Sequence, residues 1–438
     1  MVDLHARLIP EPAYNILRVL QENGYAGVVA GGAVRDMHME KVPKDVDILT
    51  NASIPVLKVL FAGRKIRIVG KSFPVCLIDN IEVAVCRAGT KNFPEGDLGM
   101  RDFTINAMAY DPLKDVFYDP YNGIKDLDNR VIRFIRDPDA RIAEDPVRMI
   151  RGCRFAALLN ARMAEASRSA IQRHARFLIS GIPGERIRKE LIKAMAMKTP
   201  SSFFALLHTT GLLSEVLPCL DRCYGLEGGP FHGETVFDHC LLVGDALPAR
   251  QPLLRLAGYL HDTGKKDAQG IKQGRITFHG HETHTRTLEA DLDRLRFSSA
   301  RKTYILSLIR CHMRPLAKKT GPKSVRRLLA VLAANRLDFQ DFMRLRIADK
   351  KANLAKSPYT LSDIRDRVKK VTDEIARQTA FHPDDLDITG HEIMEISGLK
   401  PGPKVGRIKQ QLFEQVLDDP GLNTRERLAQ MVAAMDLD

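Results

Sequence analysis

Tryptophan is absent from this 438-residue sequence, and aromatic residues of all kinds make up only 6% of it. Recognition that relies on extensive stacking of bases on exposed aromatic side chains is therefore disfavoured. Long apolar runs are also missing, since no stretch approaches the roughly 20 residues that a membrane-spanning helix needs. No apolar segment near the N-terminus precedes a cleavage site. We expect a cytoplasmic protein with no membrane partner.

Cysteine is sparse and scattered. The seven cysteines stand mostly in apolar surroundings, at positions 76, 86, 153, 219, 223, 240 and 311. This distribution predicts reduced side chains in the core and not a disulfide framework. Cys219 and Cys223 lack a second matching pair, which argues against a zinc site.

Positive charge, by contrast, is abundant. Lysine and arginine total 67 against 54 acidic residues, which gives a formal net charge of +13. Such an excess favours an anionic partner such as RNA, and the low aromatic content favours contact with the phosphates of a duplex-like RNA. The length predicts roughly two to four domains.

The most informative stretch is a glycine turn followed by an acidic pair. Residues 25–30 are apolar and β-prone, so the chain is expected to enter Gly31 and Gly32 from a strand. Without Cβ atoms, backbone N–H groups there can approach triphosphate oxygens. Asp45 and Asp47 alternate with apolar residues, which predicts a second strand with both carboxylates on one face. Such a pair can hold Mg²⁺ ions that bridge a triphosphate and an attacking 3′-hydroxyl.

Two further motifs follow along the chain. Arg101 and Asp102 stand in GMRDFTINAMAYD, and Asp145 and Arg148 stand in EDPVRMIRGCRFAA. The last two residues are three apart, so on a helix they would share a face and present an acceptor and several donors to the edge of one base. An ordinary surface ion pair is the alternative for this spacing taken alone. Glu82, on an apparent strand, is either a third metal-proximal carboxylate or a solvent-facing residue.

In this order the motifs resemble those of the polymerase β nucleotidyltransferase superfamily, in the class II branch of bacterial tRNA CCA-adding enzymes and poly(A) polymerases. The resemblance implies an α+β fold, with a polymerase-β-like head of mixed sheet and helices followed by all-helical neck, body and tail regions. It implies that Asp45 and Asp47 are catalytic and hold two Mg²⁺ ions, with CTP, ATP and tRNA as partners. The nucleotide-binding residues that it implies are Gly31, Gly32, Arg35, Arg101, Asp102, Asp145, Arg148, Arg151 and Arg154.

The sequence departs from the family pattern at two places. Met100 stands where the family usually has a first arginine before the Arg-Asp pair. The segment between Arg87 and Arg101 is short, and in related enzymes that add only CC a shortened loop accompanies loss of the switch from CTP to ATP. The chain is thus expected to add all of CCA, or to add CC beside a separate A-adding enzyme.

A second chemistry is indicated further along. His239, the adjacent His261 and Asp262, and Asp349 follow one another in an order that resembles the HD phosphohydrolase superfamily. The resemblance implies that these four bind Mg²⁺ or a divalent transition metal, which suits imidazole and carboxylate ligands. It also implies hydrolysis of phosphoester ends such as 2′,3′-cyclic phosphates. Candidates for a second ion or for phosphate contact are Lys265, His281 and His312.

These landmarks predict four domains, at residues 1–136 (catalytic head), 137–225 (helical neck and body with the base-recognition helix), 226–355 (HD domain) and 356–438 (helical tRNA-binding tail). One competing interpretation is an HD phosphohydrolase whose head only binds RNA, and a more distant one is a poly(A) polymerase. The intact acidic pair argues against the first.

Overall fold

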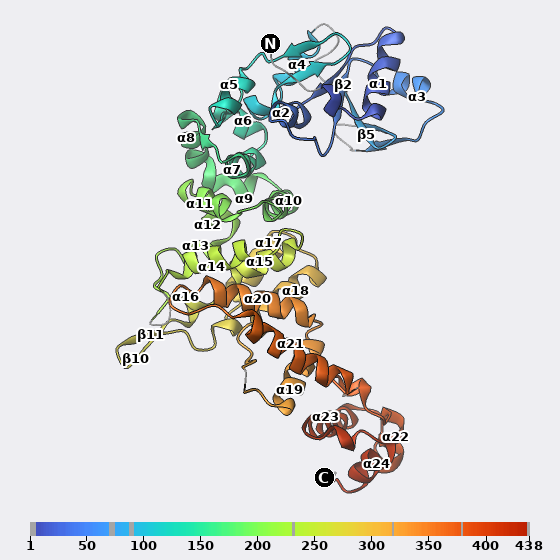
Figure 1. Ribbon diagram of the computed structural model, residues 1–438, viewed down its shortest axis with the longest axis vertical. Coiled ribbons are helices and arrows are strands. Elements are labelled where there is room, and N and C mark those ends of the chain that lie inside the picture. The colour runs from blue at the N-terminus through green and yellow to red at the C-terminus, as the bar shows by residue number, and fades with distance from the viewer. Residues whose placement is uncertain are drawn as a thin grey trace. The chain divides into compact units, whose positions relative to one another are not determined.

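The computed structural model describes residues 6–69, 75–86, 92–229, 233–317, 319–377 and 380–435. The chain divides into two compact units, of which the first comprises residues 1–190 and 205–215 and the second residues 191–204 and 216–438. The predicted fold class, a mixed sheet with helices followed by helical regions, is confirmed (Figure 1). The division into four domains stays a prediction.

The head is built on a seven-stranded mixed sheet in the order β3-β4-β5-β2-β1-β6-β7. Its strands are β1 (Gly27–Ala30), β2 (Asp47–Thr50), β3 (Ile66–Val69), β4 (Val75–Ile78), β5 (Ile81–Val85), β6 (Ala109–Asp111) and β7 (Val116–Tyr118). β2 and β5 are parallel, and the other described neighbours are antiparallel. The short apolar sequences of β1 and β2 are almost fully buried, as expected for central strands.

Side chains that alternate along the strands divide this sheet into two faces. Val29 and Ile48 join a large core on one face, which is covered by α1 (Glu11–Glu22), α2 (Gly32–His38) and α3 (Ile54–Leu60). Val28 and Leu49 join a smaller cluster on the other face, with Leu98 from α4 (Glu95–Leu98). Asp47 stands two residues before Leu49, so its side chain lies on this second face.

Helices make up most of the rest of the first unit. They are η3 (Thr104–Asn106), α5 (Gly123–Asp128), α6 (Pro138–Glu144), α7 (Val147–Leu159), α8 (Glu165–His174), α9 (Leu178–Gly181), α10 (Gly184–Met195), α11 (Ser201–Thr209) and α12 (Leu213–Val216), of which α10 and α12 end in the second unit. β8 (Val131–Ile132) and β9 (Arg162–Met163) add a short parallel pair. Asp137 accepts hydrogen bonds from two N–H groups at the start of α6 and so caps it.

The described residues of the second unit form helices and one hairpin, joined by loops. Its helices are α13 (Pro218–Asp221), α14 (Val236–Ala246), α15 (Pro252–Leu260), α16 (Lys265–Ala268), α17 (Arg286–Arg294), α18 (Ser299–Cys311), α19 (Pro322–Ala334), α20 (Phe339–Ala352), α21 (Leu361–Ala376), α22 (Gly390–Ser397), α23 (Pro403–Asp418) and α24 (Arg425–Ala433). The hairpin joins β10 (Gly270–Lys272) to β11 (Arg275–Thr277). Gln273 and Gly274 between them both have positive φ, as a tight two-residue hairpin turn requires.

Packing within this unit places the helix ends that matter for the site. α14 packs against both α15 and α20. The buried guanidinium of Arg255, in α15, donates to the carbonyls of Gly244 and Met195 at 3.1 and 2.9 Å, among others, and so ties α15 to the ends of α14 and α10. No helix among the described residues is long and apolar enough to cross a membrane.

Candidate functional site

Three carboxylates of the head lie close to one another. Asp47 begins β2 and is paired in register with Glu82 of the parallel strand β5, so both side chains lie on the same face of the sheet. Asp45 precedes the strand and is exposed. The prediction that Asp45 belongs to the strand is wrong, because β2 begins at Asp47. The pairing places the side chain of Glu82 beside that of Asp47.

Electrostatics at these carboxylates favour a cation. Burial raises the pKa of Asp47, and the negative charges of Glu82 and Asp45 raise it further, against the opposing charge of Arg101. Carboxylates that disfavour one another's charge are stabilised when a divalent cation lies between them. The oxygen donors are those that Mg²⁺ prefers. The residues present therefore fit the implied ions.

The glycine turn holds Arg101 beside this group. Gly31 follows β1 with φ of +80° and ψ of −127°, which is a conformation that glycine adopts readily and other residues rarely do. An added Cβ at this position would lie 2.2 Å from Nη1 of Arg101. Nε of Arg101 lies 3.7 Å from the Asp97 carboxylate, and its Nη1 donates to the Asn106 carbonyl at 3.4 Å. The bare backbone of Gly31 thus makes room for the guanidinium.

Gly31→Ala is expected to displace Arg101 and to reduce nucleotidyl transfer at least about tenfold, the loss that follows from about 1.4 kcal/mol of transition-state stabilisation. Gly24→Ala is the matched control, because Gly24 has φ of +81° but no atom within 4 Å of an added Cβ. Both variants carry the cost of a positive φ, about 1–2 kcal/mol, and Gly31→Ala adds the close contact with Arg101, so the thermal unfolding temperature should fall in both and further in Gly31→Ala. Equal transfer rates in the two variants would contradict the role given to this contact.

A buried polar chain lies next to the turn. Arg35 donates to the Asn106 side chain at 2.6 Å, and Asn106 donates to Asp102 at 3.0 Å. Arg151 completes the chain with a bond of 2.9 Å to Asp102. Burial alone would raise the pKa of Asp102, but the charge of Arg151 and the hydrogen bond from Asn106 hold it below its usual value. Arg35 and Asp102, both predicted to bind the nucleotide, thus belong to one network.

The predicted base-reading pair does not share a helix face. Asp145 follows α6 in an extended conformation, with φ of −156° and ψ of 94°, and α7 begins only at Val147. The prediction from the three-residue spacing is wrong, because the residue before Pro146 is excluded from the helical region by the proline ring. Arg186 instead donates to Asp145 at 2.8 Å, and Arg148 donates to Glu144 at 2.7 Å.

Glu190 is a buried carboxylate that the sequence analysis missed. It accepts a hydrogen bond from Nε of Arg154 at 2.7 Å, and its other oxygen lies 3.4 Å from Nε of Arg151. Its side chain is only 4% exposed. The signal available in the sequence was an acidic residue within the basic helical segment GERIRKEL. Glu190 fixes two predicted nucleotide-binding arginines to α10.

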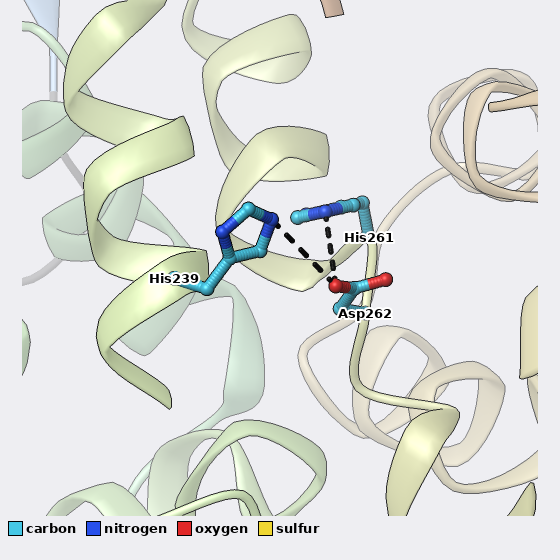
Figure 2. Close-up of side chains that lie close together, drawn as sticks. All are labelled: His239, His261 and Asp262. Carbon is cyan, nitrogen blue, oxygen red and sulfur yellow. Dashed lines mark ion pairs between the residues drawn. The ribbon is translucent and has the colours of Figure 1, made fainter. Parts of the chain in front are cut away.

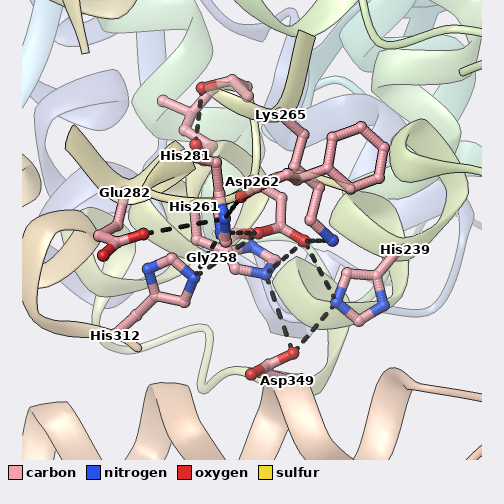
Figure 3. A network of polar contacts seen from close by, with 12 residues as sticks. His239, Gly258, His261, Asp262, Lys265, His281, Glu282, His312 and Asp349 are labelled. Atoms are coloured by element: carbon pink, nitrogen blue, oxygen red, sulfur yellow. Dashed lines mark hydrogen bonds and ion pairs between the residues drawn. The ribbon is translucent and has the colours of Figure 1, made fainter. Parts of the chain in front are cut away.

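In the second unit, the residues predicted to bind metal converge from several elements (Figure 3). His239 lies in α14 and Asp349 in α20, while His261 and His312 end α15 and α18. Asp262, Lys265 and His281 complete the cluster, and all of its members except Asp349 are buried.

Asp262 is shared between two groups of ligand atoms. Its Oδ2 lies 3.3 Å from Nε2 of His261 and 3.7 Å from Nε2 of His239 (Figure 2). Its Oδ1 lies 3.0 Å from Nε2 of His281 and 3.6 Å from Nε2 of His312. Each group has the separation expected of ligands around one ion. The arrangement can hold two ions with the Asp262 carboxylate between them.

Every imidazole in this cluster is oriented through its other ring nitrogen. The acceptors facing Nδ1 are Gly258 O for His261 at 2.8 Å, Phe278 O for His281 at 2.9 Å, Ile309 O for His312 at 2.6 Å and Glu234 Oε1 for His239 at 2.9 Å. With Nδ1 donating, Nε2 keeps a lone pair directed at the cluster centre. Nε2 of His261 is buried with no hydrogen-bond partner in the part of the chain that the structure describes. These residues fit a divalent metal.

Charges within the cluster balance one another. Burial by itself would raise the pKa of Asp262, but His261 and Lys265 hold it well below its usual range. Burial lowers the pKa of His261, but the charge of Asp262 outweighs this and raises it. The ammonium of Lys265 lies 2.7 Å from Asp262. Lys265, predicted as a phosphate contact, thus also neutralises the shared carboxylate.

Glu234 is a second residue that the sequence analysis missed. Besides facing His239, its carboxylate accepts hydrogen bonds from the backbone N–H groups of Gly233 and Leu354, at 3.0 and 3.2 Å. Carboxylates that orient metal-binding histidines typically contribute 10–100-fold to metal affinity. In the sequence, the signal for this role was the position of Glu234 five residues before His239.

Glu234→Gln keeps the side-chain shape but removes the charge, and we expect it to weaken metal binding about tenfold. Titration of the metal-free protein with Mn²⁺ or Ni²⁺ by calorimetry measures this. Glu227→Gln, at an exposed carboxylate nearby, is the control. An unchanged dissociation constant in Glu234→Gln would exclude the positioning role.

Comparisons with known proteins cover most of the chain. Residues 28–133 match the family described as "Poly A polymerase head domain", and residues 161–224 match "Probable RNA and SrmB- binding site of polymerase A". The A-adding tRNA nucleotidyltransferase of Deinococcus radiodurans is 31% identical over 338 residues, which are 73% of this chain and 74% of that protein.

Two further relatives match over shorter stretches. The CC-adding tRNA nucleotidyltransferase of Halalkalibacterium halodurans is 39% identical over 45% of this chain and 52% of its own length. Poly(A) polymerase I of Haemophilus influenzae is 34% identical over 51% of this chain and 54% of its own length. The chain thus spans about half the length of these two relatives.

Solved structures share the fold over nearly the whole chain. The CCA-adding enzyme of Bacillus stearothermophilus in complex with CTP superposes with a TM-score of 0.69 at 20% identity, covering 97% of each chain. The Thermotoga maritima CCA-adding enzyme complexed with tRNA gives a TM-score of 0.56 at 17% identity, covering 98% of this chain and 97% of that one.

Proposed function

The chain belongs to the class II family of CCA-adding enzymes and poly(A) polymerases, and from this we propose that it adds nucleotides from CTP and ATP to the 3′ end of tRNA without a template. The observation that supports this best is the group of Asp45, Asp47 and Glu82 beside Gly31 and Arg101. Two bound Mg²⁺ ions would supply charge stabilisation and an activated 3′-hydroxyl.

The chain's own residues would divide the remaining work. Asp45 and Asp47, with Glu82, would hold the ions. Gly31 would bring backbone N–H groups close to the triphosphate, and Arg101 would add a positive charge where the phosphates enter. Asp145 and Arg148 would read the base from the two sides of the Asp145–Pro146 turn, held in place by Arg186 and Glu144.

Extension assays at single-nucleotide resolution test the transferase and its specificity. The substrates are tRNAs that end before CCA, after C and after CC, each with CTP, ATP or both. Completion to CCA, a stop at CC, and addition of A only to the CC-ended tRNA identify three different enzymes, of which the second needs a separate A-adding partner. Long adenosine tails would indicate a poly(A) polymerase. Absence of any extension by folded protein with Mg²⁺ would refute the proposal.

The hypothesis that a short loop favours a CC-adding enzyme rests on the sequence. Residues 87–91 of that loop, including Arg87, lie outside the described residues. The extension assay therefore decides between the CC- and CCA-adding alternatives.

A second activity is supported by a separate observation, the two ligand groups that share Asp262. We propose that the second unit is a metal-dependent phosphohydrolase that acts on phosphoester ends such as 2′,3′-cyclic phosphates. The bound metal, a transition ion or Mg²⁺, would supply a water of lowered pKa as nucleophile. His239, His261, Asp262 and Asp349 would bind one ion, and His281 and His312 the other with Asp262.

Hydrolysis of cytidine 2′,3′-cyclic phosphate by chelator-treated protein tests this activity after addition of Mn²⁺, Ni²⁺, Zn²⁺ or Mg²⁺ in turn. The rate should depend on the ion and vanish on chelation. If no ion restores hydrolysis of this ester or of a simple aryl phosphodiester, the second activity is refuted while the transferase proposal stands.

A further inference from the structure

A cavity of about 730 Å³ opens onto the histidine-aspartate cluster. Asp262, His281, His312 and Asp349 line one part of it. Its volume is typical of sites that enclose a whole organic ligand, and far exceeds the space that one phosphate group needs. The residues beyond the cluster are therefore available to contact other parts of a larger substrate.

The acidic residues that line the cavity gather at the cluster, while its cations lie both at the cluster and on the hairpin β10–β11. Its acidic lining residues are Asp262, Glu282 and Asp349, all at or next to the cluster. Arg346 lies 3.3 Å from Asp349 and is engaged there. The other cationic lining residues are Lys265, Lys272, Arg275, Lys350 and Lys356. A substrate whose negative charge extends beyond the reacting phosphate matches this distribution.

The hairpin β10–β11 carries two of these cations in an unusual arrangement. Lys272 and Arg275 are directly opposite each other in the register of the hairpin. Both are exposed, and neither side chain forms an ion pair with any residue that the structure describes. Like charges directly opposite on paired strands destabilise a hairpin. An anion bound between them would remove that cost.

Apolar side chains complete the cavity. Phe278 and Tyr359 line it, and the ring of Tyr359 has the guanidinium of Arg367 at 4.3 Å and the ammonium of Lys350 at 5.9 Å from its centre. In a chain with few aromatic residues, two of them lie in this cavity. Aromatic surface next to cations suits nucleotides of a single strand.

We propose that this cavity takes the end of an RNA strand and not a free nucleotide. The terminal phosphoester lies at the histidine-aspartate cluster, and Lys272 and Arg275 bind an internal phosphodiester of the same strand. The inference rests on the proposed phosphohydrolase and specifies its substrate. In the reaction a P–O bond forms to water oxygen, the P–O bond to one ribose oxygen breaks, and that oxygen takes the proton.

The test compares two substrates of the metal-loaded full-length protein. These are cytidine 2′,3′-cyclic phosphate and a tetraribonucleotide that ends in the same cyclic phosphate. The wild type should show a kcat/KM about tenfold or more higher for the tetranucleotide, because charge-assisted phosphate contacts are each worth about that factor. Lys272→Ala/Arg275→Ala should remove this preference and leave the mononucleotide rate within twofold.

Two further readouts separate binding from turnover. A tetranucleotide with a 3′-phosphate should inhibit mononucleotide hydrolysis, with an inhibition constant that rises about tenfold in the double variant. For the tetranucleotide, log kcat/KM should decrease as log salt concentration rises. In the double variant the magnitude of this slope should be smaller by about 1.4, or 0.7 for each lost contact. Arg301→Ala/Lys369→Ala removes two exposed cations outside the cavity and is the control.

Each contrary outcome is distinct. If the wild type has equal kcat/KM for the two substrates, the inference is overturned and the proposed phosphohydrolase activity is unaffected. Equal losses on both substrates in the double variant would place the two cations at the reacting phosphate and also overturn it. If neither substrate is hydrolysed, the proposed phosphohydrolase activity and the inference are both overturned.

Discussion

Asp47→Asn is expected to reduce nucleotidyl transfer by about a thousandfold or more, because a lost metal ligand removes several kcal/mol and each 1.4 kcal/mol or so is worth a factor of ten. The same variant should be at least as stable as the wild type when no Mg²⁺ is present. The reason is the raised pKa of Asp47, which shows that its ionised form is disfavoured in the folded protein.

The direction of the pKa shift of Asp47 determines how the stability of the Asp47→Asn variant depends on pH. A carboxyl whose pKa is raised on folding contributes its full stability below the unfolded value of 3.8 and loses that contribution as the pH rises through the folded value. The stability advantage of the Asp47→Asn variant should therefore be absent in acid and present at neutral pH. Thermal unfolding at several pH values, with and without Mg²⁺, measures it.

Mg²⁺ should stabilise the wild type and have a smaller effect on the Asp47→Asn variant, since a ligand stabilises the state that binds it. Glu22→Gln, which removes an exposed carboxylate of α1 with 63% side-chain exposure, should match the wild type in both transfer and response to Mg²⁺. An Asp47→Asn variant that retained more than a tenth of wild-type transfer would exclude Asp47 as a metal ligand.

The second large effect concerns the shared carboxylate of the other unit. Asp262→Asn should abolish the phosphohydrolase and lower the bound metal from two ions per chain to fewer than one, since Asp262 alone belongs to both ligand groups. The variant also removes the carboxylate charge that lies 2.7 Å from the buried ammonium of Lys265. Breaking a buried ion pair in this way typically costs about 3–5 kcal/mol, so the metal-free variant should unfold at lower temperature.

Elemental analysis, thermal unfolding and both enzymatic assays on one preparation measure these changes. Transfer to tRNA at a temperature where the variant is folded should stay at the wild-type rate. Asp267→Asn is the matched control, because Asp267 lies five residues away with 34% side-chain exposure and pairs with Arg222 outside the cluster. Loss of only one ion in Asp262→Asn would show that the carboxylate does not join the two groups.

Short-range patterns predicted most of what is local. The strand that leads into the turn at Gly31 followed from the apolar sequence before two glycines, whereas the helix α2 that begins at Gly32 was not predicted. The break at Asp145 follows from Pro146, whose ring disfavours the helical region for the preceding residue, and the three-residue spacing to Arg148 does not contain this signal. The hairpin β10–β11 falls within a region expected to be helical, although a Gln-Gly turn between alternating residues is a hairpin signal.

What sequence could not supply depends on packing between distant segments. Glu190 and Glu234 acquire their roles because each faces side chains from other elements in a buried setting. The hydrogen bond from Arg35 to Asn106 likewise comes from a tertiary contact that no local pattern contains.

The residues that we propose as metal ligands in the second unit are synthesised in a fixed order. His239 and Asp349, whose side chains lie 3.1 Å apart, are separated by 110 residues. At the usual rate of about 5–20 residues per second, a ribosome would need roughly 6–22 s to make the intervening chain. His261 and Asp262 follow His239 closely, so a partial set of ligands exists well before α20 emerges. A nascent chain arrested before residue 349 is therefore expected to bind metal weakly. Tight metal binding should begin only once α20 has fully emerged from the ribosome.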